Sequence, residues 1–301
     1  MLTRLNRLYL IIKTTQNWLG VLSIWFQLKD KCVANFRNGY KFKLDRKSWS
    51  EYIRRIYLFS YFPTAKLFDE ENKLKFFYGP RELEFSFGKW GFDTVLEIFG
   101  GDPYKDFLKF APVKNKQVVD IGSAFGDTAI YFLIKGAKYV YAYEAFPGFF
   151  HLAKENLRTN GFSDSCVLVL AAVSGKSGTM MIDSKMDDMF GTGIKEPIFG
   201  EKVPIITLRQ IVEQNNIQDG FLKIDTEGYE YEILLNTPKE ILRRFSDMLI
   251  EYHYGFEKLE PYIKGAGFEI FHTGPTHVYV PQYASDENRN MYVGYITAKR
   301  K

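Results

Sequence analysis

The chain has 301 residues, of which 46% are hydrophobic and 25% charged, and its formal net charge is +4. These fractions are typical of a globular protein and exclude a wholly disordered or collagen-like chain. With only two cysteines, Cys32 and Cys166, a disulfide framework and a four-cysteine zinc site are excluded, and a reducing compartment such as the cytoplasm is indicated.

The first 60 residues are strongly basic, with 12 lysines and arginines against 3 acids. Apolar residues at helical spacing predict helices with basic faces here. Aromatic and aliphatic side chains between Trp18 and Phe26, flanked by basic residues within 1–31, permit peripheral contact with a membrane surface. We favour a helix packed on its own protein, and the uncharged stretch from Thr14 to Leu28 is too short to span a bilayer.

Residues 61–110 are rich in aromatic side chains and show no clear periodicity. The segments Phe76–Pro80 and Gly88–Gly91 are prone to turns, and a helix is expected to begin near Tyr104. We therefore expect two parts, an accessory and mainly helical region over 1–110 and a second domain over 111–301.

The second domain alternates short apolar strands with amphipathic helices. This order predicts an α/β fold, in which a parallel sheet carries helices on both faces and binds ligands beyond the carboxyl ends of its strands. Strands are expected at 117–121, 139–143, 166–173, 221–225, 248–252, 268–272 and 291–298, and helices at 127–135, 148–159, 207–215, 229–235 and 257–265.

The first two strands of this domain each end in an acid. Asp120 precedes a turn that contains Gly122 and Gly126, where missing side chains allow a ligand to approach the backbone. Glu144 ends the second strand and can accept hydrogen bonds from both hydroxyls of a ribose. The two glycines do not fit the G-x-G-x-x-G pattern of dinucleotide-binding proteins.

Two further strands end in residues that can carry chemistry. Asp225 and Glu227 follow the strand at 221–225, and they can bind a hydroxyl or an ammonium group, act as a base, or hold a metal with another acid. Glu227 can instead simply cap the next helix. His253 follows the strand at 248–252 and can exchange a proton near neutral pH, although a single histidine at a strand end is more often structural.

Together these segments resemble the FkbM family of methyltransferases, which belong to the class I S-adenosylmethionine-dependent fold. The resemblance runs from Gln117 to Glu251. It is carried by VVDIGSAFG at 118–126, YEAFP at 143–147, Asn156 and Asn160, AAVS at 171–174, VPIITL at 203–208 and, most specifically, LKIDTEGYE at 222–230.

The resemblance implies a seven-stranded Rossmann-like sheet with its last strand antiparallel, and S-adenosylmethionine as the cofactor. It implies that Asp225 faces the methionine amino group or the acceptor. The family often has Asn at the position of Ala124 and Pro at that of Ala145. The implied cofactor-binding residues are Asp120, Gly122, Ser123, Ala124 and Gly126 at the methionine end, Glu144 and Ala145 at the ribose, and Ala171 and Ala172 near the adenine.

The expected function is methyl transfer to a hydroxyl of a sugar, a glycan, a lipid-linked acceptor or another small molecule. Asp225, Glu227 and His253 are the expected catalytic residues, in no fixed order, and no metal ligands are assigned. The alternatives are an NAD-dependent oxidoreductase or epimerase, an RNA methyltransferase that uses the basic segment, and a binding module that has lost catalysis. We expect residues 1–110, 183–204 and 273–290 to select the acceptor.

Overall fold

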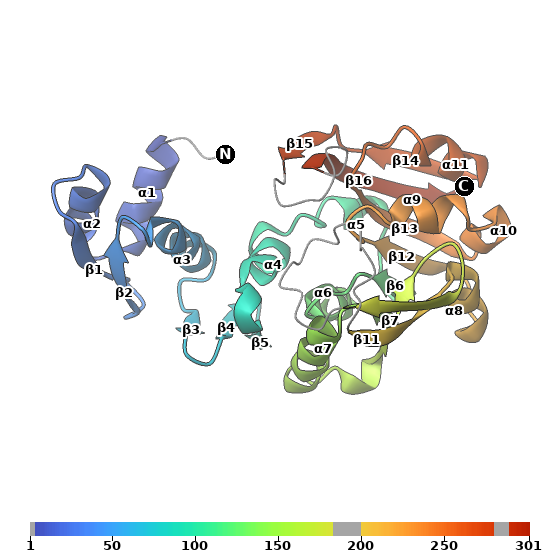
Figure 1. The fold of residues 1–301 in the computed structure, drawn as a ribbon, viewed down its shortest axis with the longest axis horizontal. Helices are drawn as coiled ribbons and strands as arrows, with labels where there is room; N and C mark the ends of the chain where they lie inside the picture. Colours follow the sequence, from blue (N-terminus) through green and yellow to red (C-terminus); the bar gives the residue numbers. More distant parts are fainter. Residues whose placement is uncertain (1–3, 183–199, 280–288) are drawn as a thin grey trace. The chain divides into compact units, whose positions relative to one another are not determined.

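The computed structural model describes residues 4–182, 200–279 and 289–301, and the expected substrate loop at 183–204 lies largely outside them. Figure 1 shows the chain coloured along its sequence. Its residues divide into two compact units, 1–102 and 103–301, where the sequence analysis placed the division after residue 110. Each unit is described here by itself.

The first unit begins with helices but is not helical throughout. The prediction of helices across residues 1–60 is wrong between Lys31 and Asp45, where the chain forms an antiparallel hairpin. Apolar and polar residues alternate in its second half, over Lys41–Asp45, and Gly39 provides the positive φ of +90° that the connecting turn needs. The elements are α1 (Arg4–Thr14), α2 (Trp18–Trp25), β1 (Lys31–Asn35), β2 (Lys41–Asp45) and α3 (Trp49–Tyr61).

The aromatic-rich part of the first unit is a three-stranded antiparallel sheet followed by short helical turns. Phe76, Phe85 and Phe99 are buried and pack together, with ring centroids 5.4 to 6.1 Å apart. The aromatic content therefore forms a local core. The elements are β3 (Lys66–Phe68), β4 (Lys73–Tyr78), β5 (Arg81–Ser86), η1 (Gly88–Trp90), α4 (Asp93–Val95) and η2 (Leu96–Gly101).

Helix α2 covers the segment expected to be an amphipathic helix. It buries Val21 and Ile24, whereas Leu19 and Phe26, the residue after it, are 67% and 65% exposed. No helix in the described part of the chain has both the length and the hydropathy needed to cross a lipid bilayer.

The second unit is built on one sheet in the order β14-β16-β13-β12-β6-β7-β8, with β15 paired to β16. Its parallel strands are joined through helices, and β16 is antiparallel to both of its neighbours on this path, which confirms the predicted antiparallel last strand. With β15 the sheet has eight strands, one more than the seven expected. The main-sheet strands are β6 (Gln117–Ile121), β7 (Tyr139–Glu144), β8 (Cys166–Leu170), β12 (Gly220–Ile224), β13 (Phe245–Tyr252), β14 (Phe268–His272), β15 (Thr276–Tyr279) and β16 (Asn290–Arg300).

The side chains of the central strands alternate between the two faces of the sheet. On β12, Leu222 and Ile224 join one large buried cluster with residues of the later helices, whereas Phe221 packs against Phe132 of the helix after β6 at 5.5 Å. The helices are α5 (Phe107–Phe110), α6 (Asp127–Ile134), α7 (Pro147–Thr159), η3 (Ser163–Ser165), α8 (Leu208–Gln214), α9 (Glu230–Leu235), α10 (Lys239–Leu242) and α11 (Leu259–Gly265).

Two details of the second unit differ from the sequence analysis. The strand expected over 166–173 breaks at Ala171, and its last part leaves the main sheet to join a small one. The helix expected from Tyr104 forms only at Phe107. The small sheet has the order β10-β11-β9, made of β9 (Ala172–Val173), β10 (Gly178–Ile182) and β11 (Glu201–Ile206).

Candidate active site

The carboxyl ends of four strands meet at one edge of the main sheet. β6 lies between β12 and β7. From β6 the chain first adds β7 and β8 on one side, and later adds β12 and β13 on the other. In open α/β sheets this is the place where ligands bind, because the loops diverge there. All of the acids singled out in the sequence lie on these strands or just after them.

The turn after β6 is shaped by residues with positive φ. Gly122 has φ +78°, and a Cβ there would lie 1.8 Å from the carbonyl oxygen of Asp225, so only glycine fits. Ala124 also has a positive φ of +42°, which is unfavourable for an alanine. Gly126 has φ +77° and packs against Ala153 of α7. The two glycines thereby let the turn pack closely against the loop after β12 and against α7.

Glu144 lies at the end of β7 and holds the glycine turn through its carboxylate. One oxygen accepts a hydrogen bond from the backbone N–H of Ala124 and the other from that of Phe146, both at 2.8 Å. The side chain is 4% exposed. Burial raises the pKa of Glu144 to about 7, although the two backbone N–H groups favour the charged form.

Asp120 is fully buried and forms an ion pair with Lys223 of β12, its direct cross-strand neighbour in the parallel register. The Lys223 ammonium lies 3.1 Å from Asp120 Oδ1 and donates to the carbonyl of Gly122 at 2.6 Å. Thr128 of α6 donates to the other oxygen of Asp120 at 2.6 Å. Asp120 is therefore linked to the turn through Lys223.

Lys223 remains an ammonium in this environment. Burial alone would lower its pKa, but the carboxylates of Asp120 and Asp225 outweigh that effect and raise the pKa above its ordinary value. Asp225 Oδ2 lies 3.9 Å from Lys223 Nζ, so one buried cation links the acids of the first and fourth parallel strands.

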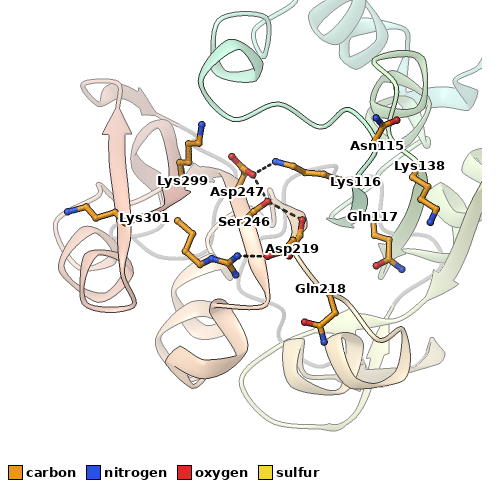
Figure 2. A pocket seen from close by; sticks show the side chains of 11 residues that line it. Asn115, Lys116, Gln117, Lys138, Gln218, Asp219, Ser246, Asp247, Lys299 and Lys301 are labelled. Atoms are coloured by element: carbon orange, nitrogen blue, oxygen red, sulfur yellow. Dashed lines mark hydrogen bonds and ion pairs between the residues drawn. The ribbon is translucent and has the colours of Figure 1, made fainter.

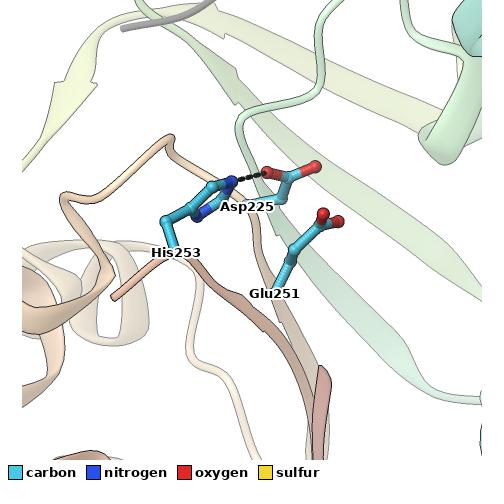
Figure 3. Close-up of side chains that lie close together, drawn as sticks. All are labelled: Asp225, Glu251 and His253. Atoms are coloured by element: carbon cyan, nitrogen blue, oxygen red, sulfur yellow. Dashed lines mark ion pairs between the residues drawn. The ribbon is translucent and has the colours of Figure 1, made fainter. Parts of the chain in front are cut away.

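The turn after β12 brings Asp225, Glu227 and His253 together, as Figure 3 shows for Asp225 and His253. His253 Nε2 lies 3.3 Å from Glu227 and 3.9 Å from Asp225. Glu227 has φ +53°, an unfavourable conformation for a long side chain and one that often marks functional sites. The two carboxylates are partly exposed, whereas the imidazole is buried.

Glu230 fixes this arrangement from within the protein. Its carboxylate is fully buried and accepts hydrogen bonds from the backbone N–H groups of Gly228 and His253, at 2.9 and 2.8 Å. It also pairs with His253 Nδ1 at 3.1 Å. Burial alone would lower the pKa of His253, but Glu230, Glu227 and Asp225 raise it to about 10.

The remaining predicted residues lie near the same edge. Ser123 is fully buried, and its hydroxyl has no hydrogen-bond partner in the described structure. Ala145 and Ala172 are half-buried, and Ala171 is buried, with its N–H bonded to the carbonyl of Glu144. The predicted site residues thus lie along one edge of the sheet. The predicted cofactor-binding residues lie at the ends of β6, β7 and β8, and the predicted catalytic residues lie after β12 and β13.

Sequence reasoning missed three residues here: Lys223, Glu230 and Tyr104. Lys223 and Glu230 were part of the recognised motif but had been given no role. A lysine between Phe221-Leu222 and Ile224 in a wholly buried strand was the available signal, because such a lysine needs a buried acid. Tyr104 is 2% exposed, and burial together with the charges of Asp225 and Glu251 raises its pKa.

A depression at the opposite edge of the sheet has a different character (Figure 2). It lies at the amino ends of the parallel strands, and its side chains are polar and largely basic. It is far from the strand ends that carry the acids, and we assign it no part in the chemistry. Its lining residues include Lys116, Lys138, Asp219, Asp247, Lys299 and Arg300.

Comparison with known proteins relates the chain to methyltransferases. The family described as the methyltransferase FkbM domain matches residues 120–270, half of the chain. A putative RNA methyltransferase from Pyrococcus horikoshii is similar at 13% identity, over 67% of this chain and 85% of its own, with a TM-score of 0.39.

Two other solved structures are similar at the same level. TrmK of M. capricolum in complex with S-adenosylhomocysteine is 14% identical over 65% of this chain and 68% of its own, with a TM-score of 0.41. TYW2 of M. jannaschii in complex with AdoMet is 14% identical over 78% of this chain and 90% of its own, with a TM-score of 0.37. These likenesses carry no argument about the acceptor. No curated protein matches the chain.

Proposed function

Because the chain belongs to the FkbM family of methyltransferases, we propose that it transfers the methyl group of S-adenosylmethionine to a hydroxyl oxygen of a sugar, a glycan or another small molecule. The observation that carries this proposal is the meeting of two sets of acids at one sheet edge. Glu144 lies beside the glycine turn, and Asp225 and Glu227 lie at the neighbouring turn after β12.

The residues beside β7 fit a sulfonium nucleoside. At Gly122 the carbonyl of Asp225 fills the space of a side chain, so the glycine turn packs directly against the loop after β12. The buried hydroxyl of Ser123 has no hydrogen-bond partner in the described structure, and a ligand can provide one. Each oxygen of Glu144 uses one lone pair on a backbone N–H and keeps capacity for a ribose hydroxyl. Asp120 would act indirectly, by holding Gly122 through Lys223.

The residues after β12 would hold the acceptor. S-adenosylmethionine supplies an electrophilic methyl carbon, so the protein mainly aligns the acceptor and excludes water. As the acceptor oxygen bonds to this carbon, the sulfur–carbon bond breaks and its electron pair returns to sulfur. We assign the hydroxyl proton to the carboxylate of Asp225 or Glu227, which both lie beside His253.

The acidic character of this edge favours a neutral polyol over RNA as the acceptor. Carboxylates accept hydrogen bonds from hydroxyl groups, whereas they repel the phosphates of a nucleic acid backbone. The carboxylates of Asp225, Glu227 and Glu251 all lie here. The basic residues in 1–60 are the feature that favours RNA, which is why RNA is included in the test.

Calorimetric titration of S-adenosylmethionine tests the cofactor side. Wild type is expected to bind it, Glu144→Ala to lose at least tenfold in affinity, and Asp120→Ala to lose affinity together with stability. Glu269→Ala, an exposed acid on β14, is the matched control and should bind as wild type does. Unchanged affinity in both Glu144→Ala and Asp120→Ala would contradict the proposal.

Transfer of an isotope-labelled methyl group tests the acceptor side. Glycans, small sugars and RNA are offered in parallel, and labelled glycan or sugar is expected. Asp225→Asn and Glu227→Gln should lower the rate about 100-fold while the affinity for S-adenosylmethionine stays within a few-fold of wild type. Label appearing on RNA alone would replace the sugar acceptor with a nucleic acid.

A further inference from the structure

We infer that Asp225, Glu251 and His253 form a site for a divalent metal ion that holds the acceptor hydroxyl. This inference rests on the proposed function and adds a metal to it. One ligand atom from each of the three side chains lies within 4.8 Å of the others (Figure 3). The residues come from the ends of the adjacent strands β12 and β13, so the sheet itself fixes their spacing.

The buried imidazole is oriented as a metal ligand. His253 is 2% exposed, and its Nδ1 pairs with the buried carboxylate of Glu230 at 3.1 Å. Nε2 points toward the carboxylates of Glu227 and Asp225, at 3.3 and 3.9 Å. These acids favour a proton on Nε2 when no metal is present, and a metal ion bound there would replace that proton. In proteins, a histidine that binds a metal through one nitrogen typically donates its other N–H to a carboxylate in this way.

The donor set indicates the kind of ion. Two carboxylates favour hard cations such as Mg²⁺ and Mn²⁺, and an imidazole favours transition metals, so Mn²⁺ fits both. Three protein ligands leave coordination positions open for oxygen atoms of the acceptor. Glu227 and Asp225 lie on the same turn, and Glu227 then remains to take the proton of the hydroxyl.

The proposed site also narrows the class of acceptor. An ion bound at this edge would accept an electron pair from the hydroxyl oxygen and weaken its O–H bond, and the proton would pass to Glu227. Two neighbouring hydroxyl groups can bind one ion together. We therefore expect an acceptor with a vicinal diol, such as a sugar with adjacent free hydroxyls, to be preferred to its mono-hydroxyl analogue.

Titration of Mn²⁺ into the full chain tests the site directly, with calorimetry and the electron paramagnetic resonance of bound Mn²⁺ as readouts. One ion is expected to bind wild type. Glu251→Gln and His253→Asn should each weaken binding at least tenfold, and Glu230→Gln by about 10- to 100-fold. Glu269→Gln and His151→Asn, exposed residues outside the site, should bind Mn²⁺ as wild type does.

Because His253 is buried, its substitution can unfold the protein, so circular dichroism is used to establish that each variant is folded. If His253→Asn is unfolded, the Mn²⁺ affinity of Glu251→Gln decides the test. Absence of Mn²⁺ binding to folded wild type at millimolar concentration would overturn the site, as would equal binding by wild type and Glu251→Gln.

Activity separates failure of the metal site from failure of the proposed function. Methyl transfer that continues unchanged in excess EDTA, with S-adenosylmethionine bound, overturns the metal site and leaves the methyltransferase intact. No binding of S-adenosylmethionine with or without Mn²⁺ overturns the proposed function itself. Restoration of EDTA-treated enzyme by Mn²⁺, with greater gain for the diol acceptor, supports both.

Discussion

The two edges of the main sheet use charge in different ways. At the amino edge, Lys116 pairs with Asp247 and Arg300 with Asp219, and the Arg300 and Asp219 side chains are 33% and 71% exposed. At the carboxyl edge, Asp120, Lys223 and Glu230 are buried and share partners with one another or with the backbone. Asp247 is buried at the amino edge too, but water can replace the partners of Arg300 and Asp219 there, whereas each of the three charges at the carboxyl edge depends on its neighbours.

This contrast predicts that the largest effect comes from removing the buried cation. Lys223→Met leaves Asp120 buried without its ion pair and should lower the free energy of unfolding by about 3–5 kcal/mol. Arg300→Met at the amino edge is the control, with an expected loss below about 1 kcal/mol. Urea denaturation measures both variants.

Adding Asp120→Asn to Lys223→Met should recover part of the lost stability, since the unpaired charge is then gone. If Lys223→Met lost no more than Arg300→Met, the distinction between the two edges would be wrong.

The second effect depends on pH and concerns Glu144. Its pKa is raised from 4.5 to about 7 in the folded protein, so the folded state keeps a proton that the unfolded chain releases. The contribution of Glu144 to stability is therefore full below about pH 4.5 and is lost as the pH rises through 7, a change of up to about 3 kcal/mol.

Glu144→Gln cannot titrate and serves as the comparison for this effect. The free energy of unfolding of wild type, relative to that of Glu144→Gln, should fall as the pH rises from 4.5 to 7 and then level off. Urea denaturation at half-unit pH intervals measures it, and a difference that stays constant or rises would show that the carboxylate is not destabilised by burial.

The smallest effect concerns backbone strain at Ala124. With φ +42°, this alanine pays a conformational cost of about 1–2 kcal/mol, which asparagine tolerates better. Ala124→Asn should raise the free energy of unfolding by about 0.5–1 kcal/mol, and the backbone bond from this residue to Glu144 should persist. Ala137 lies outside the left-handed region, so Ala137→Asn should not raise the free energy of unfolding. An equal change in the free energy of unfolding for the two variants would exclude backbone strain as the cause.

The features predicted best from the sequence are those that depend on the order of neighbouring residues, namely the strands, the helices and the acids at strand ends. The alternation of strands and helices located the sheet, and the acids at the ends of β6 and β7 and after β12 were correctly expected at one edge. The hairpin at Lys31–Asp45 was missed because its basic residues were taken for a helix face, although those of its second strand alternate with apolar ones. Lys223 and Glu230 were missed because their roles depend on contacts between separate strands, which no local pattern contains.

Glu230 has a consequence for redesigning this enzyme. One carboxylate holds the backbone at Gly228, in the loop after β12, and at His253, in the loop after β13. The two loops therefore cannot be exchanged independently. A chimera that takes only one of them from a relative would disturb the bond between this carboxylate and the exchanged loop, so new acceptor specificity should be grafted as a pair of loops together with the start of α9.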